Sequence, residues 1–144
     1  GAWIAANTRT YPIAASAITS SDYNVLYNHE FGHDADGVAM NGYVESGGVQ
    51  IGDGEDFMFV NRMIPDFEFR GTAASASMDI TLKGKDFPLN TAATLATANV
   101  TASTNQSFIR ARTRESIIRV ESTGTGYGWT LGQLRFDIRP DGRR

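Results

Sequence analysis

The stretch 56–70, DFMFVNRMIPDFEFR, constrains the fold more than any other part of the chain. Its first half carries apolar residues at both odd and even positions, which is typical of a strand that is largely buried. Pro65 interrupts the pattern, because proline has no N–H to give to a sheet. Phe67 and Phe69 then alternate with charged residues, the period of two that indicates a half-buried strand. The stretch therefore predicts a long β-strand with a break, bulge or edge near Pro65.

Similar alternation predicts strands along most of the chain, separated by turns rich in Gly and Asp. Met78, Ile80 and Leu82 share one face of the predicted strand 75–82. The paired glycines at 47–48 predict a bulge or kink within a strand. The other predicted strands are residues 25–30, 42–51, 106–114, 116–121 and 129–139. This pattern predicts an all-β fold, an antiparallel β-sandwich or barrel-like domain with little helix.

The stretch 90–98, NTAATLATA, is the one candidate helix, and an irregular loop is the alternative because threonines inside a helix are weak helix formers. Residues 1–24 show a weaker pattern. We expect this N-terminal segment to continue from a preceding β-rich module, since the chain opens on Gly1 rather than Met. Residues 25–144 are predicted to form one β-sandwich domain.

Composition excludes several classes of chemistry. The 144 residues include no cysteine, which removes disulfide scaffolds, thiolate zinc sites, iron–sulfur clusters and cysteine nucleophiles. Only two histidines are present. No apolar run approaches the roughly 20 residues that cross a bilayer, so no membrane insertion by this domain is expected. The sequence calls for no cofactor and no metal.

Charge is distributed unevenly along the chain, although the formal net charge is only −3. Residues 110–144 contain eight of the thirteen basic side chains, all arginine, against four acidic ones. Such a segment pairs with acidic side chains on a strand face, or it meets a polyanion such as nucleic acid. A ridge of four arginines facing a lumen would contact DNA phosphates without sequence preference. Facing another subunit, it would pair with an acidic turn; the residues concerned are Arg110, Arg112, Arg114, Arg119, Asp53, Glu55 and Asp56.

The run HEFGH at 29–33 matches the zinc-protease signature H-E-x-x-H. That chemistry needs a helix, in which His29 and His33 lie one turn apart and Glu30 activates a water. Here the motif follows the strand-like VLYN, contains Gly32 and leads directly into a turn. We therefore interpret it as a strand end followed by turn residues, with a zinc metallopeptidase as the alternative function.

Two turns rich in acidic residues, 34–37 and 52–56, are candidates for calcium binding. The turn DADG at 34–37 resembles the start of an EF-hand loop, but Val38 and Ala39 stand where a ligand and a glycine are required. A plain turn is favoured. A hairpin turn is likewise favoured at 52–56, where glycines permit the backbone conformation and the charges keep the turn solvated.

Four segments resemble a known family: YNHEFGHDADG, VQIGDGEDFMFVNRMIPDFEF, MDITLKGKDFP and FIRARTRESIIRVESTGTGYGWTLGQLRFDIRPDGRR. They are similar to the C-terminal region of tail proteins of short-tailed bacteriophages, of the hub, nozzle or DNA-stabilisation type. The resemblance spans about residues 25–144. Its most specific part is the ending RFDIRPDGRR with the preceding WTLG at 129–132.

The resemblance implies a virion structural protein of the phage tail with no catalytic role and no catalytic residues. Such proteins are longer chains whose copies form a ring, commonly sixfold, around the channel through which DNA leaves, in contact with other tail proteins. In similar sequences the position of His33 is not restricted to histidine, and a glycine is favoured where Thr113 stands here. A further alternative is a receptor- or carbohydrate-binding β-sandwich of a tail fibre, which exposed Tyr127 and Trp129 would support.

Overall fold

The computed structural model describes residues 3–4, 10–16, 25–71, 74 and 76–143, and the chain divides into two compact units, 1–32 and 33–144. In the first unit, three short antiparallel strands form a sheet in the order β1-β2-β3. They are β1 (Trp3–Ile4), β2 (Ile13–Ala15) and β3 (Leu26–Asn28). The rings of Tyr11 and Phe31 meet edge to face, with centroids 5.0 Å apart. The strand predicted at 25–30 is thus β3, which pairs with β2 of this unit.

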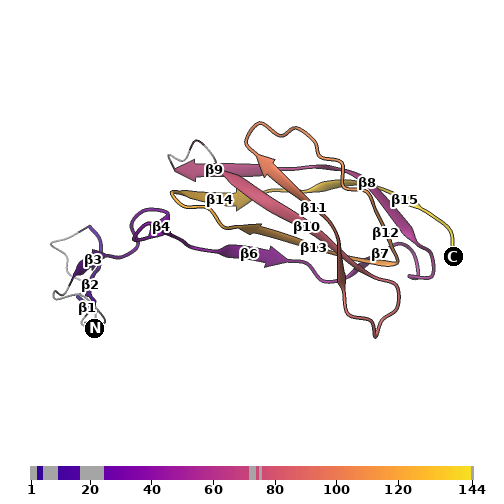
Figure 1. Ribbon diagram of the computed structural model, residues 1–144, viewed down its shortest axis with the longest axis horizontal. Coiled ribbons are helices and arrows are strands. Elements are labelled where there is room, and N and C mark those ends of the chain that lie inside the picture. The colour runs from indigo at the N-terminus through magenta and orange to yellow at the C-terminus, as the bar shows by residue number, and fades with distance from the viewer. Residues whose placement is uncertain (1–2, 5–9, 17–24, 72–73, 75, 144) are drawn as a thin grey trace. The chain divides into compact units, whose positions relative to one another are not determined.

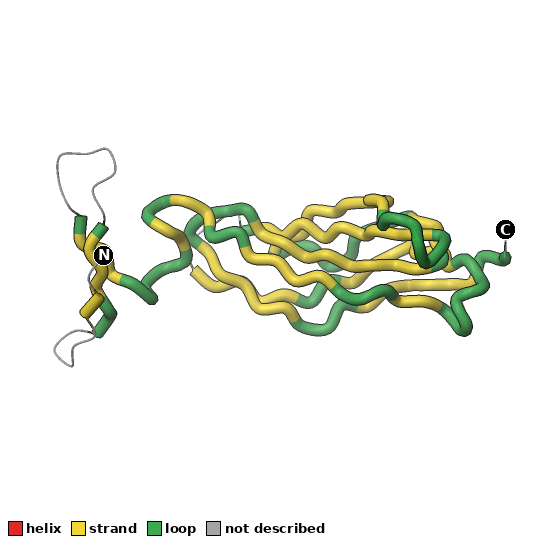
Figure 2. Tube along the Cα trace, turned by 90° about the horizontal axis from the view of Figure 1, so that it is seen from below, coloured by secondary structure: helices red, strands yellow, loops and turns green. Residues whose placement is uncertain are grey.

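The second unit holds two layers of antiparallel strands (Figures 1 and 2). One layer, here called the first sheet, has the order β11-β10-β13-β6, and the short β7 also pairs with β13. Its strands are β6 (Gly42–Glu45), β7 (Val49–Gln50), β10 (Ser77–Lys85), β11 (Ala93–Thr101) and β13 (Glu115–Ser122).

The other layer, the second sheet, is built around two long strands that are each interrupted once. The order β12-β8-β15 continues beyond the interruption as the pair β9-β14. These strands are β8 (Met58–Ile64), β9 (Phe67–Gly71), β12 (Ala111–Thr113), β14 (Tyr127–Leu131) and β15 (Arg135–Pro140). Pro65 lies in the gap between β8 and β9, so the predicted break is confirmed.

A small hairpin, β4 (Asp34–Ala35) and β5 (Val38–Ala39), precedes the first sheet. Its turn residues Asp36 and Gly37 both have positive φ, 56° and 78°, and the Gly37 N–H donates to the Asp34 carboxylate over 3.1 Å. This is the plain turn that the sequence favoured over an EF-hand loop.

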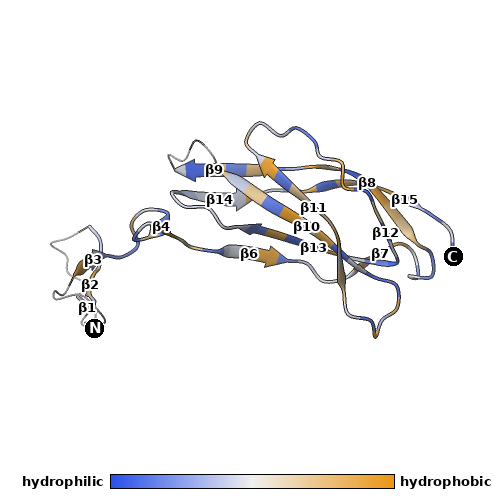
Figure 3. Ribbon diagram, viewed as in Figure 1, coloured by the Kyte–Doolittle hydropathy of each residue, from blue (hydrophilic) through white to orange (hydrophobic). Residues whose placement is uncertain are grey.

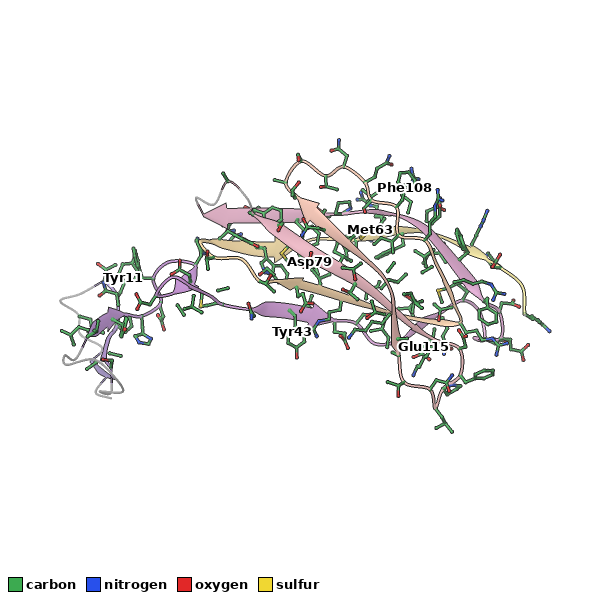
Figure 4. All side chains as sticks on the ribbon, in the orientation of Figure 1. Tyr11, Tyr43, Met63, Asp79, Phe108 and Glu115 are labelled. Atoms are coloured by element: carbon green, nitrogen blue, oxygen red, sulfur yellow. The ribbon has the colours of Figure 1, made fainter. Side chains whose placement is uncertain are left out.

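The core lies between the two sheets of the second unit. Met63 points into this interior in Figure 4, and Figure 3 shows apolar segments on the strands that enclose it. Full burial of one such side chain contributes about 1.5–3 kcal/mol. The buried apolar residues of this cluster are Met58, Val60, Met63, Met78, Ile80, Leu82, Val100, Ile109, Ala111 and Val120. The predicted inward face of 75–82 is therefore confirmed.

A β-bulge in β8 explains why that strand shows no simple alternation. Arg62 pairs with Asp137 of β15, but Val60 pairs with the next residue, Ile138, so Asn61 is an extra residue. An extra residue shifts the side-chain parity. The buried set consequently passes from Met58 and Val60 to Met63.

The all-β prediction is confirmed, and the sandwich rather than a barrel is observed, because the sheets stay open at their edges. Both alternatives for the stretch 90–98, a helix and an irregular loop, were wrong, since this stretch lies largely in β11 and pairs antiparallel with β10. Tertiary pairing overrides the weak local propensity of an Ala/Thr sequence. The described residues contain no helix long and apolar enough to span a membrane.

Candidate functional site: an arginine-rich sheet face

The outer side of the second sheet gathers most of the arginines of the chain. Phe59 lies between the buried Met58 and Val60, and its cross-strand partners are Arg112 of β12 and Arg139 of β15. Alternation across the strands therefore directs these side chains away from the core. We call this surface the arginine face; it consists of Phe57, Phe59, Arg62, Arg110, Arg112, Arg135 and Arg139, with Arg114 at its end.

Phenylalanine rings hold several of these guanidinium groups in place. The Arg112 guanidinium carbon lies 3.8 Å from the Phe57 ring centroid, and that of Arg139 lies 4.8 Å from the Phe59 centroid. Arg114 approaches two rings, Phe57 at 4.7 Å and Phe87 at 5.2 Å. Such cation–π contacts are each worth about 0.5–1 kcal/mol at exposed sites. They also restrict the rotation of the planar groups.

Five guanidinium groups of this surface have no carboxylate partner in the part of the chain that the structure describes: Arg62, Arg110, Arg114, Arg135 and Arg139. Arg62 donates only to the amide oxygen of Gln106, over 3.3 Å. Arg62 and Arg135 line one shallow depression together with Ile64, Phe136 and Asp137. Arg114 donates through one terminal N–H to the Arg143 carbonyl over 3.0 Å, whereas its buried Nε has no hydrogen-bond partner within the same described residues.

The predicted arginine ridge is thus divided between two surfaces. Arg110, Arg112 and Arg114 lie along the second sheet, and Arg112 is paired with Asp141 at 2.6 Å. Arg119 lies on β13 of the first sheet, where it pairs with Glu45 and Glu121 of the same chain.

The predicted acidic turn also finds partners within the chain. Arg143 pairs with Asp56 at 3.2 Å and with Glu55 at 3.5 Å. Asp53 lines a separate depression near Arg114 and Glu115. Of the three acidic residues of this turn, Glu55 and Asp56 are therefore paired within the chain, and Asp53 forms no ion pair with the described residues.

The outer side of the first sheet contrasts with the arginine face, because all its cations are paired. Lys83 donates to Glu45 over 2.6 Å, and Lys85 lies 2.9 Å from Glu115. Arg119 joins Glu45 and Glu121, and it also lies over the Tyr43 ring, whose side chain points outward in Figure 4. We call this set the paired face.

The ion pairs of the paired face perturb its titrating groups. Hydrogen bonding from Lys83 holds the pKa of Glu45 below its ordinary value, and the bond from Lys85 does the same for the pKa of Glu115. The hydrogen bond to Glu121 raises the pKa of Arg119. Each charged group therefore stabilises the charged form of its neighbour.

The HEFGH motif does not form the helix that a zinc protease needs. Glu30 has a φ of 57° and Gly32 a φ of 82°, so the chain turns there. His33 instead packs on two glycines of paired strands: a Cβ at Gly71 or Gly128 would lie 2.9–3.0 Å from its ring. No group of three or more His, Asp or Glu side chains gathers for a metal among the described residues.

The aromatic pair considered for carbohydrate binding lies largely inside the sandwich. Tyr127 is buried, and its hydroxyl donates to the Ser77 carbonyl over 2.7 Å. The Trp129 indole N–H donates to the Ser122 hydroxyl over 3.0 Å. Neither ring forms an exposed platform, which weakens the alternative that depends on them.

Comparison with known proteins adds no relative: no protein-family model matches this chain, and no curated protein matches it either.

Sequence reasoning missed Arg62, Arg135 and Arg139. The available signal was their alternation with apolar residues, which places them on a solvent-facing side. No single strand could show that β8 and β15 lie side by side, or that the Asp137 carboxylate accepts a hydrogen bond from the Asn61 amide and forms no ion pair with Arg62.

Proposed function

We propose that this chain is a structural subunit of a short-tailed phage tail, of the hub or nozzle type. In this proposal its copies assemble as a ring, commonly sixfold, around the DNA exit channel, beside other tail proteins. The role is architectural and not catalytic. The support comes from the sequence resemblance over residues 25–144 and from one structural observation, an open sheet edge suited to assembly.

That observation is the edge of the first sheet at β11. Residues 96–101 pair regularly with β10 on one side, and no described strand covers the other side. This segment carries no charge and no proline. Natural proteins usually protect exposed edges with charges, prolines, bulges or short strands. An unprotected stretch of this length is expected where a neighbouring chain covers it.

Several other edges of the sandwich carry such protection, whereas β14 (Tyr127–Leu131) is also uncharged but is five residues long against nine for β11. β15 contains Arg135, Asp137, Arg139 and Pro140, and β12 is three residues long. The β6–β7 edge is interrupted at Gly47-Gly48. Residues 96–101 are therefore the edge segment at which contact between copies is favoured. A ring requires a heterologous contact, in which this edge meets a different surface of the next copy.

Native mass spectrometry of the full chain tests assembly. The wild type should form closed rings, and Asn99→Lys should weaken them about tenfold or more, because a lysine protects the edge while pairing with Asp79. Thr125→Lys in an exposed turn is the matched control and should leave the rings intact. A chain that stays monomeric at every concentration contradicts the proposal.

Antibody labelling of tailed particles from the source culture tests location. Label at the distal end of the tail supports the proposed function, whereas a chain absent from particles contradicts it.

A further inference from the structure

The distribution of unpaired charge singles out one surface of the sandwich. Every lysine and arginine of the paired face has a carboxylate partner within the described chain, whereas five guanidinium groups on or beside the second sheet have none. Unpaired like charges on one face add up to a positive surface potential that attracts a negatively charged partner.

The geometry of the arginine face suits phosphate groups. Arg139 and Arg114 stand on phenylalanine rings, which limits their rotation before any ligand arrives. A guanidinium held in this way loses less conformational entropy on binding, and its planar N–H edge matches a phosphate bidentately. The depression lined by Arg62 and Arg135 brings together two more arginines outside ion pairs, with the carboxylate of Asp137 beside them.

A second copy of this chain is a poor source of the missing negative charge. The acidic groups of the paired face are already engaged by Lys83, Lys85 and Arg119, and Glu55 and Asp56 are engaged by Arg143. The described carboxylates outside ion pairs are scattered: those at 36, 53 and 86 lie in turns, Asp79 lies on β10, and Asp137 lies on the arginine face itself. They offer no row of charge to match that of the arginine face.

The rings of the arginine face favour a duplex over a single strand. Phe57 and Phe59 are each covered by a guanidinium, so they are not free to stack on unpaired bases. A sheet face that presents side chains at one level also does not enter a groove as a helix does. Backbone contact without base reading is what this surface permits.

We propose that the arginine face binds the phosphate backbone of double-stranded DNA without sequence preference, through Arg62, Arg110, Arg114, Arg135 and Arg139. The inference rests on the proposed function in one respect: the proposed function is what identifies this duplex as the phage genome. Mass measurement tests the ring and a DNA titration tests the face, so either can fail alone.

Fluorescence anisotropy of the full chain with a labelled mixed-sequence duplex, repeated at several salt concentrations, tests the proposal. Each phosphate contact contributes about 0.9 to the slope of log K against log salt. The triple variant Arg62→Gln/Arg135→Gln/Arg139→Gln should lower this slope by about 2.7. The matched triple variant Lys83→Gln/Lys85→Gln/Arg119→Gln removes the same net charge from the paired face and should leave the slope unchanged.

Arg110→Gln keeps the test decisive if a triple variant fails to fold. Arg110 is exposed and forms no hydrogen bond, ion pair or ring contact with the described residues, so its loss should leave folding intact and lower the slope by about 0.9. The proposal is overturned if the wild type does not bind DNA, if both triple variants lower the salt slope equally, or if one duplex sequence is strongly preferred. It is also overturned if the arginine variants change the assembled mass and not DNA binding, because the partner is then a second copy.

Discussion

The two outer faces of the sandwich both hold long cationic side chains in place, but they do so with different partners. Both are solvent-facing sides of antiparallel sheets with long cationic side chains and an aromatic ring beneath a guanidinium. On the paired face, Glu45 joins two cations at once. On the arginine face, Arg114 and Arg139 lie over phenylalanine rings and form no ion pair with the described residues. The difference shows that restricting the position of an arginine side chain and neutralising its charge are separate effects. An aromatic ring restricts the guanidinium group and leaves its positive charge available to an anion.

Gly84 gives the largest expected effect, because it lies where the two sheets meet and both faces depend on it. A Cβ there would come within 2.5 Å of side chains of Leu95 and Thr113. Gly84→Ala should lower the free energy of unfolding by about 1–3 kcal/mol in urea titrations. Gly47→Ala, where nothing lies within 4 Å, is the control and should change little.

Removing two carboxylates should convert the paired face into a second anion-binding surface. Glu45→Gln/Glu121→Gln leaves Lys83 and Arg119 without partners. Duplex affinity at low salt should rise about tenfold, and the salt slope should steepen by up to about 1.8. An unchanged slope would show that unpaired charge alone does not create a binding face.

Acid should weaken the paired face selectively. The pKa values of Glu45 and Glu115 are lowered in the folded chain, so their contribution to stability is present above the ordinary glutamate pKa and is lost as the pH falls through the folded values. Urea unfolding of the wild type should therefore lose stability between about pH 5 and 3. Glu45→Gln/Glu115→Gln should show a flatter decline over that window; an equal decline contradicts this assignment.

The smallest expected effect concerns a ring rather than a charge. Phe59→Leu keeps an apolar side chain but removes the ring under Arg139. DNA affinity should fall about twofold to fivefold, since the lost contact is worth about 0.5–1 kcal/mol, while the salt slope stays constant. Tyr43→Leu, under the paired Arg119, is the matched control and should leave DNA binding unaltered.

Local patterns predicted the strands well where one face is clearly buried, as for Met78 and Ile80 in β10. They failed at β11, because an Ala/Thr sequence has no strong preference and its strand state comes from pairing with β10. The candidate site was predicted only in part. Residue spacing grouped Arg119 with Arg112, but cross-strand register, which no single segment contains, places these two arginines on opposite sheets.

The extra residue Asn61 in β8 also governs how sequences of this kind can vary. With Asn61 as the extra residue, Met63 faces the core and Arg62 faces the solvent. Deleting Asn61 would remove the bulge and leave both directions unchanged, because Val60 and Arg62 already pair with consecutive residues of β15. Deleting Arg62 instead, with the bulge kept, would turn Met63 outward. We therefore expect β8 to tolerate the loss of this one residue, whereas a one-residue deletion elsewhere in the strand would need compensating exchanges of polar and apolar residues.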